Sequence, residues 1–155
     1  MKTTFLIIGL LFAATFTSNA QEISQNAIGV RLGSNNGFGG EISYQRKMGD
    51  GNRLEIDLGL RNSNGTDSFK ATGIYQWVWS LENRFNWYAG AGAGIGSIKA
   101  AGVSETFLFA TGDIGIEYNF EAPILLSLDY RPEFGFNDSY KGLNSDIALS
   151  VRYQF

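Results

Sequence analysis

The last eleven residues, SDIALSVRYQF (145–155), place an apolar side chain at every second position. The apolar positions of this stretch all carry odd numbers: Ile147, Leu149, Val151, Tyr153 and Phe155. The even positions hold mostly polar residues: Asp146, Ala148, Ser150, Arg152 and Gln154. Because successive side chains of a strand point to opposite faces, the stretch predicts a strand with one apolar and one mostly polar face.

The same alternation recurs through the chain and is clearest in RLEIDLGLR (53–61). Clean repeats also cover residues 28–33, 41–45, 113–120 and 126–131, while 69–79 and 87–97 are less regular. Together with the last stretch, these segments predict eight strands. No 3.6-residue apolar period appears after Ala20, so no helix of useful length is expected.

Two kinds of connection alternate between these strands. Tight connections are expected at residues 48–52, 80–84 and 121–123, and mostly longer polar ones at 34–38, 62–67, 98–104 and 135–144. Gly, Asn and Asp at these places supply the positive φ that turns require. This alternation indicates an antiparallel up-and-down meander whose two ends face different surroundings.

The bulk composition limits the domain count and the class of protein. The chain has 155 residues, enough for one domain, and residues 1–20 have the charge, apolar run and small residues of a cleaved signal peptide. Residues 21–155 then form the barrel domain, with eleven basic and 15 acidic residues, or −4. This balance argues against nucleic acid, and the lack of cysteine excludes disulfides and cysteine lipidation.

Eight alternating strands can close in two ways. A soluble lipocalin-like barrel encloses its apolar face, whereas a membrane barrel turns that face toward lipid. The aromatic residues favour the membrane barrel, because they gather at the two ends as interfacial girdles do. At the tight-turn end we expect Trp77, Trp79, Phe85, Trp87, Tyr118, Phe120, Tyr153 and Phe155. At the loop end we expect Phe38, Phe69, Phe107, Phe109, Phe134 and Phe136.

The polar face carries charges of both signs, which would pair across a narrow lumen. We expect a luminal charge network of Arg31, Glu41, Arg53, Glu55, Asp57, Arg61, Asp113, Glu117, Asp129, Arg131, Asp146 and Arg152. Buried charges are tolerated only when they are paired and hydrogen-bonded. An eight-stranded barrel is just wide enough for its side chains to fill it, so the interior would be a plug. A solvated outer surface with mixed charges is the competing interpretation.

The stretch YAGAGAGIG (88–96) places four glycines on one strand face: Gly90, Gly92, Gly94 and Gly96. It lacks the spacing and the helix of a nucleotide-binding loop. Glycine within a strand usually marks close approach by a bulky group. We expect a luminal row that leaves room for long Arg, Glu and Tyr side chains, and a lipid-facing groove is the alternative.

Taken together, these features resemble the small outer-membrane β-barrels of the OmpA/OmpX-like superfamily over residues 21–155. The most specific element is the last strand, and LDYRPEF (128–134) is similar to the seventh strand of Bacteroidetes-type members. The resemblance implies an eight-stranded transmembrane barrel in a Gram-negative outer membrane, in contact with its lipid. It also implies that Leu149, Val151, Tyr153 and Phe155 form the signal read by the barrel-assembly machinery.

The absence of histidine and cysteine excludes several chemistries. Ser–His and Cys–His nucleophilic systems and zinc sites built on those ligands are ruled out. Small-barrel enzymes rely on an active-site histidine, so the resemblance does not extend to them. Glu55 and Asp57 share a face with Arg53 and Arg61, which favours internal salt bridges over acid–base catalysis or a Ca²⁺ site.

The sequence therefore predicts a non-enzymatic envelope barrel, with no cofactor or metal and with adhesion or binding through its loops. Residues 135–144, with Tyr140 and Lys141, are the expected contact surface. A soluble carrier of an apolar ligand and a narrow passive pore remain open. Pro132 lacks a backbone donor, so we expect a bulge or a strand end there.

Overall fold

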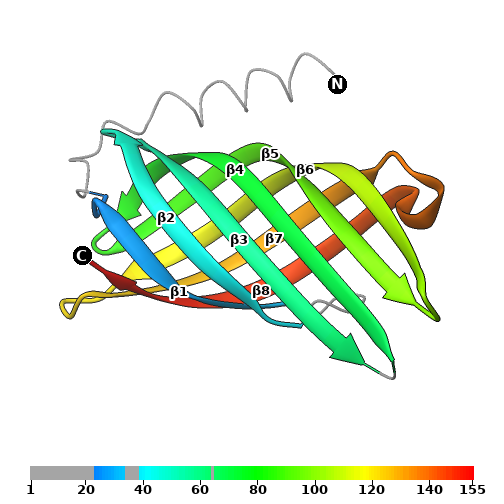
Figure 1. The fold of residues 1–155 in the computed structure, drawn as a ribbon. Helices are drawn as coiled ribbons and strands as arrows, with labels where there is room; N and C mark the ends of the chain where they lie inside the picture. Colours follow the sequence, from blue (N-terminus) through cyan, green and yellow to red (C-terminus); the bar gives the residue numbers. More distant parts are fainter. Residues whose placement is uncertain (1–22, 34–38, 64) are drawn as a thin grey trace, which may run out of the picture.

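The computed structural model describes residues 23–33, 39–63 and 65–155, and its strands close into one antiparallel barrel in sequence order (Figure 1). The elements are β1 (Asn26–Gly33), β2 (Glu41–Gly49), β3 (Asn52–Ser63), β4 (Thr66–Glu82), β5 (Phe85–Ala100), β6 (Val103–Asn119), β7 (Ile124–Gly135), the 3₁₀ turn η1 (Asp138–Tyr140) and β8 (Gly142–Gln154). The predicted eight-stranded up-and-down barrel is confirmed. The predicted signal peptide and the 34–38 loop lie outside the described residues.

The last strand closes the barrel against the first. Leu149 pairs with Leu32 and Tyr153 with Ile28, so alternating residues of β8 keep one face along the whole seam. The seam continues to the last residue, where Asn26 N donates to Phe155 O at 3.0 Å and Phe155 N donates to Asn26 O at 2.9 Å. The stretch 145–155 is therefore the closing strand.

The connections at the two ends differ from the predicted ones in length. Two-residue turns join β2 to β3 and β4 to β5, at the end where the C-terminus lies (Figure 1). At the opposite end, the loops expected at 62–67 and 98–104 are mostly strand, and β5 meets β6 through Ala101 and Gly102 alone. Both residues have positive φ, at 49° and 82°, as a tight hairpin turn requires. We call the two ends the turn end and the loop end.

The apolar face of the strands points outward. Ile56 and Leu58 are 39% and 44% exposed, whereas Glu55 and Asp57, which alternate with them, are 0% and 1% exposed. The same parity holds on β8, where Leu149 and Val151 are exposed and Ser150 and Arg152 are buried. The described residues include no helix long and apolar enough to cross a membrane.

The aromatic residues of the turn end lie on the outer surface. Trp77 and Trp79 of β4 are exposed, and Trp79 stacks on Trp87 of β5 with ring centroids 4.4 Å apart. Tyr118 meets the Phe120 ring edge-on at 4.8 Å. This arrangement covers the outside of the turn end with amphipathic rings.

The loop-end girdle is only partly as expected. Phe69, Phe134 and Phe136 are exposed on the outside, and Phe38 lies outside the described residues. Phe107 and Phe109 are instead almost fully buried inside the barrel, so their assignment to the outer girdle was wrong. Strand parity explains the error, because both share the face of Asp113 rather than that of Ile114.

Pro132 lies within β7, which continues to Gly135, so the expected strand end is wrong. Thr111 pairs with Glu133 and Ile114 with Tyr130, which leaves the same number of residues on each strand and no bulge. Between these pairs the β6–β7 ladder is interrupted. The Thr111 hydroxyl lies 2.8 Å from the Gly112 carbonyl oxygen and 3.1 Å from the Pro132 carbonyl oxygen, and can donate its one proton to either.

Candidate functional site

The barrel interior is filled by charged and polar side chains. Thirteen charged residues are buried there. Five of these are cations: Arg31, Arg53, Lys70, Arg131 and Arg152. Eight are carboxylates: Glu41, Glu55, Asp57, Asp113, Glu117, Asp129, Glu133 and Asp146. Every second residue of a strand faces inward, so all eight strands supply polar groups to one enclosed space.

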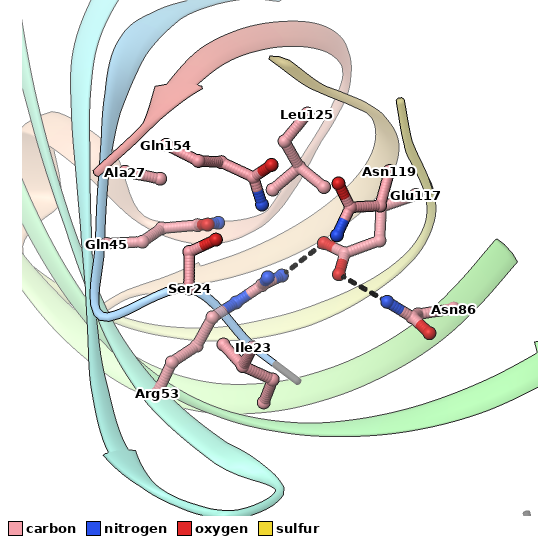
Figure 2. A pocket seen from close by; sticks show the side chains of 10 residues that line it. All are labelled: Ile23, Ser24, Ala27, Gln45, Arg53, Asn86, Glu117, Asn119, Leu125 and Gln154. Carbon is pink, nitrogen blue, oxygen red and sulfur yellow. Dashed lines mark hydrogen bonds and ion pairs between the residues drawn. The ribbon is translucent and has the colours of Figure 1, made fainter. Parts of the chain in front are cut away.

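One ion pair closes the interior at the turn end. Arg53 Nη2 lies 2.8 Å from Glu117 Oε2, and Asn86 donates to the other Glu117 oxygen at 3.2 Å (Figure 2). Arg53 also donates to Gln76 at 2.5 Å, and its guanidinium carbon lies 4.8 Å from the centre of the Tyr88 ring. The cavity beside this pair has a volume of about 10 Å³, room for about one water molecule.

A second ion pair closes the interior at the loop end. Lys70 Nζ lies 2.5 Å from Glu133 Oε1, and the Tyr140 hydroxyl donates to Glu133 Oε2 at 2.7 Å. The Lys70 ammonium lies 5.1 Å from the centre of the Phe109 ring, and Tyr140 stacks on Phe107 with centroids 4.5 Å apart. The aromatic rings and this pair together form a lid over the lumen.

The β7–β8 connection is fixed to the barrel wall. Phe136 N donates to Leu108 O at 3.1 Å, and Leu108 N donates to the Asn137 side chain at 2.9 Å. Burial and the bond to Glu133 raise the pKa of Tyr140, so its hydroxyl stays protonated. Of the expected contact surface, Tyr140 therefore points into the mouth, whereas Lys141 is exposed and pairs with Asp138 at 3.8 Å.

Between the two end pairs lies a group that we call the central cluster. It contains three arginines and six carboxylates: Arg31, Arg131, Arg152, Glu41, Glu55, Asp57, Asp113, Asp129 and Asp146. Arg131 from β7 is its hub. Its Nη1 lies 2.6 Å from Asp57 Oδ2, and its Nη2 pairs with Glu55. Three further carboxylates, Asp113, Asp129 and Glu41, lie 3.5, 3.8 and 3.9 Å from its nitrogens.

The other two arginines complete the central cluster. Arg31 holds three carboxylates, with Glu41 at 3.0 Å, Asp129 at 2.5 Å and Asp146 at 2.7 Å. Arg152 contacts Glu55 at 3.1 Å and donates to the hydroxyl oxygens of Ser43 at 2.9 Å and Ser127 at 2.8 Å. A planar guanidinium with five donors can hold several carboxylates in this way.

The glycine row of β5 faces the lumen, and its neighbours differ from the expected ones. A Cβ on Gly94 would lie 2.1 Å from the Phe109 ring, and one on Gly96 would lie 2.2 Å from the Phe107 ring. The room is therefore occupied by the two phenylalanine rings of the lid, not by Arg or Glu. A tyrosine occupies the space above a different glycine, because Tyr88 of β5 lies against Gly115 of β6.

The structure places eleven of the twelve expected luminal charges inside the barrel and leaves Arg61 exposed. Arg61 lies on β3 beyond Gly59, where the pairing with β2 ends at Glu41, so no β2 strand encloses its side. Lys70 and Glu133 were not among the luminal charges predicted from the sequence. Lys70 lies on the same face of β4 as Thr72 and Gln76, and Glu133 lies on the same face of β7 as Arg131. Strand alternation is therefore the signal that could have identified both residues.

The residues expected to form the assembly signal all lie on the outer face. Leu149, Val151, Tyr153 and Phe155 are exposed along the closing strand, and the last two rings stack at 6.3 Å. They are accessible from outside the barrel.

The interior offers few groups for chemistry beyond mutual neutralisation. Among the described residues, no group of His, Cys, Asp or Glu side chains is arranged to hold a metal ion. The charged groups are engaged with one another across the lumen, and large rings close the loop end. This arrangement fills the barrel with fixed charges of both signs.

Comparisons with known proteins match the fold. No family model and no curated protein matches the sequence. Among solved structures, the chain is similar to the N-terminal β-barrel domain of Pseudomonas aeruginosa OprF, with TM-score 0.67, 14% identity, and coverage of 86% of this chain and 100% of that one. Neisserial surface protein A has TM-score 0.59 and 16% identity, covering 84% and 94%. The attachment invasion locus protein Ail of Yersinia pestis has 0.56 and 15%, covering 85% and 97%. The chain shares the β-barrel fold of these three proteins.

Proposed function

We propose that this protein is an integral outer-membrane β-barrel with a closed interior, a non-enzymatic envelope-supporting role and a cleaved signal peptide. One observation carries the proposal: the barrel exposes its apolar side chains and encloses its charges. Ile42, Leu60 and Leu128 represent a surface of large apolar residues that would aggregate in water and suits acyl chains. Outer-membrane lipid is therefore the proposed surrounding, and the exposed closing strand supports recognition by the barrel-assembly machinery.

The same observation weighs against the soluble carrier. A lipocalin-like barrel needs an apolar cavity, whereas this lumen is lined by paired charges. We expect the expressed protein to sediment with outer membranes and to migrate differently on a gel with and without boiling. Release by osmotic shock, as for a periplasmic protein, would contradict the proposal.

The interior also supports a closed barrel over a passive pore. An ion crossing the lumen would have to pass the Lys70–Glu133 pair, the central cluster and the Arg53–Glu117 pair in turn. We expect planar bilayers containing the protein to show no steady conductance. Removing two of the three lid rings with Phe107→Ala and Tyr140→Ala together should still give no steady conductance, because the central cluster lies below them. A steady conductance of the wild-type protein would instead favour the pore.

A second role, adhesion or binding at the loop end, is supported by the projecting part of the sheet. β4, β5 and β6 are 17, 16 and 17 residues long, against 8 and 9 for β1 and β2. β6 pairs with β7 only from Phe109 onward, with Leu108 bonded to Phe136 and Asn137. Within the described residues, the exposed Ser104 and Thr106 make no such bond to the β7–β8 side. An unpaired strand edge can accept an extended peptide as an additional strand.

Panning a phage-displayed peptide library on barrels in vesicles tests this role. We expect extended, β-prone peptides to be enriched, and Thr106→Pro to lower their capture about tenfold by removing an edge donor. Lys99→Ala, on the neighbouring β5, is the matched control and should leave capture unchanged. If the Thr106→Pro variant captured peptides as well as the wild-type protein, binding at the unpaired edge of β6 would be contradicted.

A further inference from the structure

The central cluster has an imbalance of charge. Its three guanidinium groups face six carboxylates. On one side, Arg53 and Glu117 form a one-to-one pair, and on the other, Lys70 pairs with Glu133 and lies 4.0 Å from Glu41 of the cluster. With every carboxylate ionised, the cluster would carry a net charge of −3. Lys47 of β2 is half-buried at the turn end, where it pairs with Arg53 of β3, and it lies outside this cluster. Uncompensated charge of this kind is strongly disfavoured in an enclosed, low-dielectric space.

Two members of the cluster are less well compensated than the others. Asp57 Oδ1 and Asp113 Oδ1 are buried and have no hydrogen-bond donor among the described residues. Their other oxygens do have donors, Arg131 for Asp57 at 2.6 Å and Gln76 for Asp113 at 2.5 Å. Asp129 differs, because the Arg31 Nε and Nη2 nitrogens donate to it at 3.1 and 2.5 Å.

The surroundings of Asp57 also contain a polar atom without a partner. Thr72 of β4 pairs directly with Asp57 across the β3–β4 ladder, and its buried hydroxyl has no hydrogen-bond partner. Side chains so paired have Cβ atoms about 4.5–5.5 Å apart. The charged groups around Asp57 are Glu55 on its own strand, Glu41 on β2, Lys70 on β4, Asp113 on β6, Arg131 and Asp129 on β7 and Arg152 on β8. Carboxylates outnumber cations in this set.

We propose that the folded barrel holds carboxyl protons in its lumen near neutral pH, on Asp57 and Asp113, and therefore takes up protons when it folds. Carboxyl groups of the unfolded chain are ionised at this pH, so the protons come from solvent. A proton on Asp57 Oδ1 would neutralise one charge, and this oxygen could then donate a hydrogen bond to the Thr72 hydroxyl. Neutralising Asp57 and Asp113 would lower the charge of the cluster from −3 to −1.

Proton uptake on folding is the direct test. The urea-unfolded chain is diluted into phosphatidylcholine vesicles in weakly buffered solution near neutral pH, and the acid consumed per folded barrel is measured. We expect one to three protons for the wild-type protein. Asp57→Asn and Asp113→Asn should each lower the uptake by about one proton, because the amide replaces a neutral acid of the same shape. In infrared spectra, each variant should lose part of the carbonyl band of protonated carboxyl groups.

Glu105→Gln is the matched control, since Glu105 lies on β6 like Asp113 but is exposed and outside the cluster. It should leave proton uptake unchanged. Uptake unchanged in both Asp57→Asn and Asp113→Asn would overturn the proposal. So would uptake of sodium in place of protons, detected as a loss of folding when sodium is replaced by N-methylglucamine. Failure to insert into the vesicles, seen on the unboiled gel, would instead count against the proposed membrane location, so the two failures are distinguishable.

Discussion

Replacing Arg131 with glutamine should lower the free energy of unfolding by about 3–5 kcal/mol, the range typical of breaking a buried ion pair. The guanidinium is enclosed and directly contacts Asp57 and Glu55, with three more carboxylates within 4 Å. Its removal leaves these carboxylates facing one another with only Arg31 and Arg152 to compensate them. The measurement is a urea titration in vesicles, with the folded fraction read from the unboiled gel.

Arg61→Gln is the matched control for this variant. Arg61 lies on the same parity of β3 as Arg53 but is exposed, so its replacement should change stability by less than about 0.5 kcal/mol. The loss caused by Arg131→Gln should also shrink as the pH falls, because protons then neutralise the stranded carboxylates. An Arg131→Gln barrel as stable as the Arg61→Gln barrel would show that the central cluster contributes little to folding.

Replacing Gly92 with alanine should destabilise the barrel by about 3 kcal/mol, at the upper end of the range for overpacking. A Cβ on Gly92 would lie 2.0 Å from the Gly73 carbonyl oxygen and 2.8 Å from the Ile74 Cα. These are backbone atoms of the adjacent strand, so β4 and β5 would have to separate there.

Gly73→Ala provides a neighbouring comparison for the same measurement. Gly73 is part of the same β4–β5 ladder, opposite Ala93, but a Cβ there would meet no atom within 4 Å. Alanine at this position should leave stability unchanged or raise it slightly, because it restricts the unfolded chain. Equal effects at Gly92 and Gly73 would mean that strand propensity, rather than the close approach of β4, accounts for the loss.

The fold class was accessible from the sequence because alternation has the period of a strand and no competing period. Residues 53–61 and 145–155 specified both the strands and their two faces, and the structure has the same parity at Ile56, Leu58, Leu149 and Val151. Two loop predictions failed because residues 62–67 and 98–104 contain turn-forming residues whose flanks still pair. Turn chemistry marks where a chain can reverse, but cross-strand pairing decides how far each strand extends.

The arrangement of side chains in the interior could be predicted only in part from the sequence. Strand parity assigns Asp57 and Arg131 to one lumen, but their contact joins residues 74 positions apart and depends on the stagger of the closed barrel. Phe107 and Phe109 were misplaced because aromatic rings occur both in girdles and in cores. Only the pairing of β6 with β5, which packs the two rings over Gly94 and Gly96, shows that they close the loop end together with Tyr140.

The sequence by itself determined that the chain forms strands with one apolar and one charged face, because side-chain direction along a strand is a local property. Tertiary structure alone decided which charges are in contact, including the grouping of three arginines with six carboxylates. It also decided that two phenylalanine rings and Tyr140 cover this group. The physical reason is closure: joining β1 to β8 sets the register of every strand around one axis. That register fixes the height of each side chain inside the barrel, which no segment of the sequence records on its own.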